Sequence, residues 1–445
     1  MVQKMLKEYF QFEKRNTNVK TEVVAGLTTF LTMAYIIFVN PSILSATGMD
    51  KEGLIAVTCI ITATATILTG IVAKAPIAMA PGMGLNTFFV VLVASGKMNW
   101  QTALGAVFLS GVIFFLLTLT GLRKKVIEAI PPSLVSAIAV GIGLFITFVG
   151  LKSLGIIIKD EVTFVTDAPL SLTILIGLFG LLVMIFLEIK KVTGALLAGI
   201  AASTLLALIT NRIELPQQIF SSHLDISTVA FKLDIWGAFK WGFFGSIFTL
   251  TFIDMFDSVG TLVACCHQAN MVDENNQIKG LDRLLMIDAS VTILGALLGT
   301  STVTSYVESA AGIEQGGRSG LTSVTTGILF LLALLFIPIV AIVPPYATAP
   351  ALIMVGLFMI KEVKAIDWAN MEEAFPAFII IVMIALSYSI STGLAFGFIS
   401  YTLIKVITGK AREIRPAMCI IVIFSALFLT SERIGDLVEY VKTAF

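Results

Sequence analysis

The sequence predicts an all-α polytopic membrane protein with about fourteen spans, arranged as two inverted repeats of seven. Hydrophobic residues make up 57% of the 445 residues and charged residues only 13%, whereas a soluble domain carries about 25% charged residues. Apolar runs near the roughly 20 residues that cross a bilayer as a helix recur along most of the chain. The chain is therefore expected to span the membrane many times, and no separate soluble domain is visible.

Short polar connections separate the expected spans. We expect the spans at residues 21–39, 54–73, 77–95, 102–122, 132–151, 169–189, 193–211, 241–265, 283–300, 303–318, 320–340, 346–361, 375–390 and 391–409. A further apolar stretch, Pro416 to Thr430, is short, and the sequence leaves open whether it crosses the membrane or lies at its surface. The charged residues 1–20 lack the apolar core and cleavage site of a signal peptide, so we expect a cytoplasmic N-terminal segment.

Basic residues set the expected orientation. With the N-terminus in the cytoplasm, the clusters at 123–125, 190–191 and 410–415 lie inside, while the basic residues left outside are scattered. The positive-inside rule favours this orientation, and we expect the plasma membrane as the location. The basic residues lie at span ends and form no nucleic-acid surface. The four cysteines lack ligand-like spacing, so neither a zinc site nor a disulfide framework is expected.

Two halves of the sequence look alike. Pro131-Pro132 precedes Gly143-Leu144-Phe145, and Pro344-Pro345 precedes Gly356-Leu357-Phe358 at the same spacing. Because seven is odd, a second set of seven spans enters the membrane in the opposite sense, as in many secondary transporters. We expect the repeats at 21–211 and 241–410, followed by a C-terminal segment at 411–445.

The third span of each half is interrupted. The first contains Pro81, Gly82 and Gly84, and the second runs from a Thr/Ser-rich stretch into glycines at 316–317. Unwound backbone at membrane depth occurs where it is buried in protein or lines a cavity. We expect an extended piece over 301–306 that leads into a half-helix whose early part carries Glu308. Such a matched pair points to a transporter's binding site, although a kinked helix packed through small residues is the alternative.

Three acidic residues lie deep in apolar segments. Asp254 and Asp257 share roughly one helix face, with Thr261 one turn beyond, and Glu308 stands among small residues. An ionised acid at the bilayer centre costs at least about 2.5 kcal/mol, so intramembrane acids are functional candidates. The alternative for each is a purely structural hydrogen bond. Asp288, by contrast, is expected at an ordinary span entry.

These motifs resemble the AzgA-like purine permeases, the hypoxanthine, guanine and adenine branch of the nucleobase:cation symporter family. The likeness rests on residues 80–86, 254–262 and 299–318. It implies a core domain and a gate domain, with short antiparallel strands in the third and tenth spans and a base bound between them against the eighth. It also implies purine import by proton symport with an elevator-type motion, and a homodimer. No cofactor is expected.

The resemblance also implies roles for individual residues. Glu308 matches the tenth-span carboxylate that grips the base. Alignment on Gly260 matches Asp257 to the eighth-span carboxylate and Thr261 to a nearby titratable position, whereas a shifted alignment gives the substrate role to Asp254. Both aspartates and Glu308 are candidates for proton coupling. The expected substrate-binding set comprises Gly84, Asn86, Phe88, Asp254, Asp257, Thr261, Thr304, Ser305 and Glu308.

A purine base fits these residue types. Its N–H groups can donate charge-assisted hydrogen bonds to a carboxylate, Asn86 can donate and accept at a second edge, and Phe88 or Phe252 offers a ring for stacking. The alternative is an anion transporter or channel on the same fold, which relies on positive potential and is opposed by acids facing the solute. An enzyme is not expected, because the chain has only two histidines and no nucleophile with a plausible base. No metal site is expected either.

Overall fold

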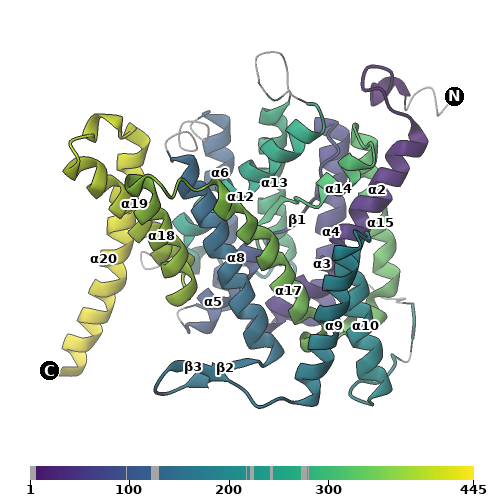
Figure 1. Cartoon of the computed structure of the whole chain (residues 1–445), viewed down its shortest axis with the longest axis horizontal. Coiled ribbons are helices and arrows are strands. Elements are labelled where there is room, and N and C mark those ends of the chain that lie inside the picture. Colours follow the sequence, from purple (N-terminus) through teal and green to yellow (C-terminus); the bar gives the residue numbers. More distant parts are fainter. Residues whose placement is uncertain are drawn as a thin grey trace.

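The structure, a computed structural model, is a bundle of helices around one pair of short strands (Figure 1). It describes residues 7–96, 98–121, 130–216, 218–220, 225–240, 244–271, 278 and 280–444, without the side chains of residues 244, 256, 259, 260 and 431–444. The basic cluster at 123–125 and the expected start of the eighth span at 241–243 lie outside the described residues.

One group of elements forms the core domain. Within it α2 and α4 pack against α15, and α6 packs against α13. Its helices are α2 (Val19–Met33), α3 (Ile36–Leu44), α4 (Lys51–Leu68), α5 (Met83–Ala94), α6 (Trp100–Leu119), α12 (Phe244–Gln268), α13 (Leu281–Leu298), α14 (Ser309–Glu314), α15 (Gly320–Ala333) and α16 (Ile337–Ala341). Its strands are β1 (Met79–Pro81) and β4 (Val303–Ser305).

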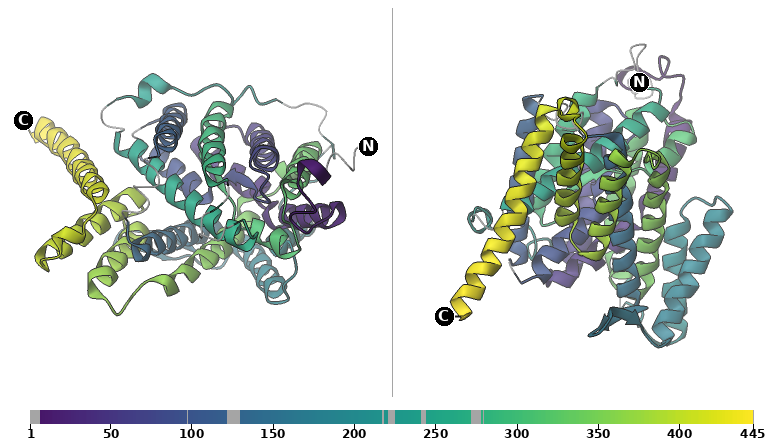
Figure 2. Two further views of the ribbon diagram at one scale, coloured as in Figure 1. Left: turned by 90° about the horizontal axis from the view of Figure 1, so that it is seen from above. Right: turned by 60° about the vertical axis from the view of Figure 1, so that its left-hand side comes forward.

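A second group forms the gate domain. Here α8 packs against both α17 and α18, α18 packs against α19, and α9 packs against α10 and α17. The helices are α8 (Pro132–Leu154), α9 (Leu172–Ile189), α10 (Ala195–Ile209), α17 (Pro345–Ile360), α18 (Met371–Leu386) and α19 (Ile390–Ile407). A short helix, α11 (Ile235–Ala238), lies between the halves, and α20 (Pro416–Ala444) projects from the body (Figure 2).

The helix boundaries follow from local chemistry. Asn18, Asp50 and Asn99 each precede a helix, and each side chain accepts a backbone N–H of the first turn of α2, α4 or α6. Prolines begin α8 and α17, where a missing N–H removes no intrahelical hydrogen bond. Eight helical segments of the described chain are long and apolar enough to cross a membrane, and shorter helices complete the other spans.

The structure adds three details that the sequence does not predict. The first span breaks at Ala34 and Tyr35 into α2 and α3. The apolar stretch from Pro416 to Thr430 is the beginning of a single helix that continues to Ala444. A two-stranded hairpin, β2 (Ile157–Asp160) with β3 (Phe164–Asp167), follows α8.

Hydrogen bonds in the hairpin turn explain why it forms. The Asp160 carboxylate accepts the backbone N–H groups of Thr163 at 2.7 Å and Val162 at 2.8 Å. These hydrogen bonds lower the pKa of the Asp160 carboxyl. The turn therefore rests on one acidic side chain that caps two open backbone donors.

The repeated Gly-Leu-Phe motif marks the place where the two halves meet. Gly143 on α8 faces Gly356 on α17, since a Cβ on Gly356 would lie 2.5 Å from the Gly143 carbonyl oxygen. A Cβ on Gly143 would lie 2.8 Å from the Met359 Cβ atom. Equivalent residues of two repeats touch only near the axis that relates them, so this crossing lies on the pseudo-two-fold axis.

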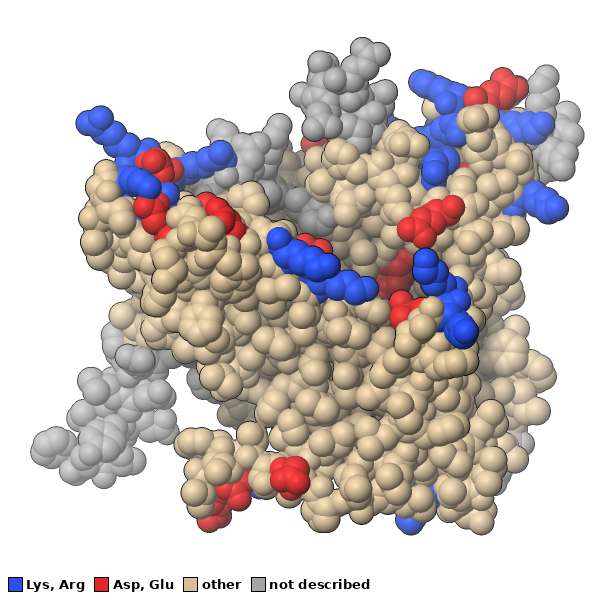
Figure 3. All heavy atoms as spheres, in the orientation of Figure 1, with Lys and Arg blue, Asp and Glu red and all other residues tan. Residues whose placement is uncertain are grey.

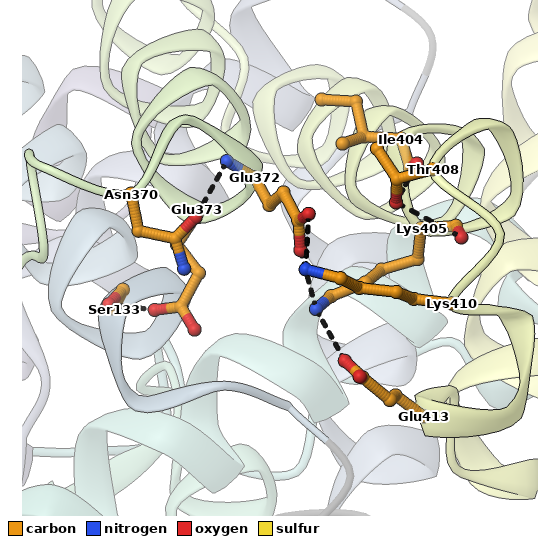
Figure 4. A network of polar contacts seen from close by, with 9 residues as sticks. All are labelled: Ser133, Asn370, Glu372, Glu373, Ile404, Lys405, Thr408, Lys410 and Glu413. Carbon is orange, nitrogen blue, oxygen red and sulfur yellow. Dashed lines mark hydrogen bonds and ion pairs between the residues drawn. The ribbon is translucent and has the colours of Figure 1, made fainter.

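Ion pairs hold one end of the gate domain together (Figure 4). Lys405 on α19 contacts Glu372 on α18 at 2.9 Å and Glu413 at 2.7 Å, and Lys410 contacts Glu372 at 2.6 Å. Networks of several charges contribute more than isolated surface pairs. The network therefore ties α18, α19 and the segment after α19 into one unit.

Most of the charged side chains visible in Figure 3 lie in the upper half of the view and a few lie at its lower end, while other residues form most of the remaining visible face. Large apolar side chains are exposed on the described helices, among them Leu182 at 66%, Leu205 at 59% and Leu403 at 54%. An apolar belt of this kind matches the hydrocarbon region of a bilayer.

Replacing Gly356 with valine should destabilise the gate domain. The new side chain meets the Gly143 carbonyl and forces α8 and α17 apart, and overpacking of this kind costs about 1–3 kcal/mol. The melting temperature of the purified variant should therefore fall clearly below that of the wild type. Leu357→Ala is the matched control, because Leu357 is 49% exposed. Equal melting of Gly356→Val and wild type would contradict the close crossing.

Candidate functional site

The two interrupted spans pair with each other through β1 and β4. The strands are antiparallel, with Met79 opposite Ser305 and Pro81 opposite Val303. Beyond the strands, the Gly82 N–H donates to the Thr302 carbonyl at 3.0 Å, and the Tyr306 N–H donates to the Ala78 carbonyl at 2.9 Å. Each strand leads directly into a half-helix, α5 or α14, so the N-termini of both half-helices meet at this pair.

Glu308 stands at the N-terminus of α14, as the sequence predicts. Its side chain is half buried, and its Oε1 atom accepts a hydrogen bond from the Tyr35 hydroxyl at the break between α2 and α3. The Thr32 hydroxyl contacts the Glu308 carbonyl oxygen at 3.4 Å. Within the described part of the chain, no other residue has a hydrogen bond to this carboxylate. Among the other described residues, the hydrogen bond to this carboxylate thus comes from Tyr35 alone.

Asp257 on α12 faces the strand pair. Its Oδ2 atom accepts the Thr304 hydroxyl at 3.4 Å, and the carboxylate lies within electrostatic reach of Asp288 and Glu308. Like Glu308, the Asp257 side chain is half buried. Both acids therefore lie beside β4 and retain accessible surface.

Asp254 lies deeper, behind β4. Its side chain is 1% exposed and accepts the Thr292 hydroxyl at 3.2 Å. That hydroxyl also lies 3.0 Å from the Val303 carbonyl oxygen. Asp254 and Thr292 thus connect α12 and α13 to the outer edge of the strand, and the placement separates Asp254 from the more accessible Asp257.

Asp288 is a further buried acid that the sequence analysis assigned to a span entry. It lies two turns into α13, is fully buried, and accepts the Ser258 hydroxyl at 2.8 Å. The Ser258 carbonyl in turn accepts the Ser305 hydroxyl at 3.0 Å. Asp288 therefore supports β4 through α12. The available sequence signal was its position within an apolar run seven residues after Leu281.

Asn86 on α5 is fully buried and bound at both ends of its amide. Its Nδ2 donates to the Asn40 Oδ1 at 2.6 Å, and its Oδ1 accepts the Ser301 hydroxyl. Asn40 also donates to the Thr58 hydroxyl at 2.6 Å. The amide thus joins α3, α5 and the segment before β4.

Gly84 and Phe88 lie on the same helix but have different surroundings. A Cβ on Gly84 would lie 2.7 Å from the Ile142 Cγ2 atom of α8, so this glycine allows the gate domain to approach the core domain. The Phe88 ring is 2% exposed and packs in the main hydrophobic core. Its faces are covered by protein in this conformation.

The strand pair thus brings together part of the expected set, namely Asp254, Asp257, Thr304, Ser305 and Glu308. Thr261 lies one helical turn beyond Asp257 and is half buried. Asn86 and Phe88 lie on α5, where both side chains are buried. Among the described residues, no group of three or more His, Cys, Asp or Glu side chains is placed to hold a metal ion.

Broken spans whose half-helices meet beside accessible acids define a polytopic membrane transport protein. Residues 20–396 match the model of the Permease family, and the chain belongs to this family.

Relatives of known activity cover almost the whole chain. The guanine/hypoxanthine permease PbuG of Bacillus subtilis is 42% identical over 438 residues, which cover 95% of this chain and 99% of PbuG. The adenine permease AdeQ of Escherichia coli is 41% identical over 425 residues, which cover 95% of each chain. These relatives confirm the resemblance to the purine permeases.

A solved structure confirms the fold class. The transmembrane domain of the cyanobacterial bicarbonate transporter BicA superimposes with a TM-score of 0.62, covering 83% of this chain and 95% of that domain. The two sequences are 14% identical, so the likeness concerns the fold alone.

Replacing Thr292 with valine should loosen the strand pair. The change removes a buried hydroxyl that accepts the Val303 N–H at 3.3 Å and lies within hydrogen-bond distance of the Val303 carbonyl and the Asp254 carboxylate. Loss of such a buried hydrogen bond costs about 1–3 kcal/mol. We expect a lower melting temperature for the purified protein. Ser290→Ala on the same helix is the control, because the exposed Ser290 hydroxyl binds only its own helix, at the Met286 carbonyl. A Thr292→Val variant as stable as the control would refute the supporting role.

Proposed function

We propose that this protein imports purine nucleobases together with protons, and that Glu308 is the residue that holds the base. The observation that carries the proposal is a half-buried carboxylate at the start of a half-helix, with a hydrogen bond from the Tyr35 hydroxyl and none from any other described residue beyond Glu308 itself. A purine edge carries N–H donors, and hydrogen bonds from N–H groups to a carboxylate are among the stronger ones in proteins.

The substrate class rests on the relatives together with this chemistry. PbuG is named a guanine/hypoxanthine permease and AdeQ an adenine permease. Their sequence identities to this chain, 42% and 41%, differ by one percentage point. Purines are therefore the proposed class. Competition binding among adenine, guanine, hypoxanthine, xanthine and uracil identifies the preferred base.

Asp257 is the second acid of the proposed site, with Thr304, Ser305 and Thr261 beside it. Asp254 accepts the Thr292 hydroxyl, which also lies 3.0 Å from the Val303 carbonyl oxygen of β4, and it is proposed to act through this hydrogen bond. Gly84, Asn86 and Phe88 complete the set from α5, where they shape the half-helix that faces α8.

Proton coupling is proposed for Asp257 and Glu308, with Asp254 as the alternative carrier. The segments 244–268 and 303–314, which contain these acids, include no lysine or arginine. A carboxylate in the membrane that has no lysine or arginine in its own segment must be stabilised in another way, and binding a proton neutralises its negative charge.

An elevator-type motion of the core domain against the gate domain is the proposed transport step. The domains meet through α5 and α8, α3 and α17, and α12 and α19. Gly84 has no side chain that would obstruct the contact between α5 and α8. The N-terminus is proposed to be cytoplasmic and the location to be the plasma membrane. The end of the bundle that carries the N-terminus in Figure 1 also bears most of the blue side chains in Figure 3.

Cells that lack their own purine uptake should take up labelled hypoxanthine, guanine or adenine when they express this protein. A protonophore should abolish the accumulation, because the proton gradient drives it. Labelled bicarbonate serves as the control for an anion transporter on the same fold. Purine uptake that survives the protonophore would reject proton coupling, and bicarbonate uptake without purine uptake would reject the proposed substrate class.

Glu308→Gln should weaken purine binding about ten- to a hundredfold, because a hydrogen bond to a charged group contributes about 1.5–3 kcal/mol. The variant should still reach the membrane, since glutamine has the same shape and can accept the Tyr35 hydroxyl. Isothermal titration of the purified protein measures the affinity. Glu314→Gln, an exposed residue at the other end of α14, is the matched control. Unchanged affinity of Glu308→Gln would remove Glu308 from the site.

A further inference from the structure

A fifth carboxylate, Glu22, is fully buried at the start of α2 and far along the chain from the acids above. Its oxygens accept the backbone N–H of Arg318 at 2.9 Å, the N–H of Ser319 at 3.1 Å and the hydroxyl of Thr322 at 2.6 Å. The Thr17 hydroxyl adds a hydrogen bond at 2.8 Å. All of these partners but Thr17 lie where α14 ends and α15 begins.

The charge of Glu22 suits this location. Ser319 caps the N-terminus of α15, and the open N–H groups of a helix's first turn attract a negative charge. Arg318 lies next to Glu22, but its guanidinium donates to the carbonyls of Ile313 at 2.5 Å and Gly317 at 2.8 Å. The loop between α14 and α15 is thus held from two sides, by a carboxylate on its N–H groups and a guanidinium on its carbonyls.

The rest of α2 runs along α14. Ala25, Thr29 and Thr32 follow Glu22 at intervals of three and four residues, so they lie on one face of the helix. Gly312 of α14 packs directly on this face, since a Cβ there would lie 2.6 Å from the Ala25 carbonyl oxygen.

The same face leads to Glu308. Thr32 contacts the Glu308 carbonyl, and Tyr35, just beyond the end of α2, donates to its carboxylate. The α2 helix therefore touches α14 at both ends, with Glu22 at the loop and Tyr35 at the ligand side.

We propose that Glu22 is a positioning residue for Glu308. Its carboxylate fixes the C-terminal end of α14 against α2, and α14 is only six residues long. Because so short a helix moves as a rigid unit, a displacement of its C-terminal end also displaces Glu308 at its N-terminal end. This inference rests on the proposed role of Glu308 in purine binding.

Glu22→Gln tests the proposal in the full-length protein. The glutamine amide has one acceptor oxygen, and its NH₂ group faces backbone donors that the carboxylate had accepted. We expect faster deuterium uptake over residues 306–318, and purine affinity weakened about tenfold or more, since small displacements of a binding group have large effects. Glu22→Asp keeps the charge and should recover part of both. Affinity is measured on purified folded protein, so a lower yield does not affect it.

Glu13→Gln is the control, because Glu13 is an exposed acid of the same N-terminal segment. If Glu22→Gln does not fold, Thr322→Val removes the shortest of these hydrogen bonds and takes its place. Normal purine affinity in the variant, with or without faster exchange, overturns the proposal. If the wild type binds no purine, the proposed function fails separately, and unchanged exchange over 306–318 then rejects the positioning role on its own.

Discussion

Backbone hydrogen bonding in the middle of the bilayer is the constraint on which the rest of the structure depends. At that depth no water satisfies open N–H and C=O groups, so an interrupted span needs a protein partner. Here the two interruptions satisfy each other through β1 and β4, and the pairing continues to Gly82 and Tyr306. The half-helices α5 and α14 must therefore start at one common place, which is where side chains can meet a solute.

The acids around this pairing share one kind of partner. Each accepts a hydrogen bond from a hydroxyl: Asp254 from Thr292, Asp257 from Thr304, Asp288 from Ser258 and Glu308 from Tyr35. A hydroxyl can donate to an ionised carboxylate and accept from a protonated one, whereas a lysine or arginine would favour the ionised form alone. A hydroxyl partner can therefore bind either protonation state of an acid, which is what the proposed proton coupling requires.

The interrupted spans and their acids could be predicted because their signals are local. Pro81 and Gly82 disfavour a helix, and Glu308 stands out in an apolar run. The partners could not, because they lie far away in sequence: Tyr35 is 273 residues from Glu308, and Glu22 is 296 residues from Arg318. The helix break at Ala34 and Tyr35 could not be predicted either, because neither residue is a proline or a glycine. Asp288 follows Arg283 closely, and this proximity to a charged span end concealed its burial.

The fold alone leaves the charge of the solute open, since a bicarbonate transporter domain has the same architecture. The side chains at the strand pair carry that information. An anion beside Glu308 and Asp257 would meet two carboxylates in a region of low dielectric, where like charges repel strongly. A neutral base with N–H donors meets the same carboxylates as hydrogen-bond acceptors. Two acids that retain accessible surface beside β4 thus favour a neutral donor over an anion, and they do so independently of any likeness in sequence.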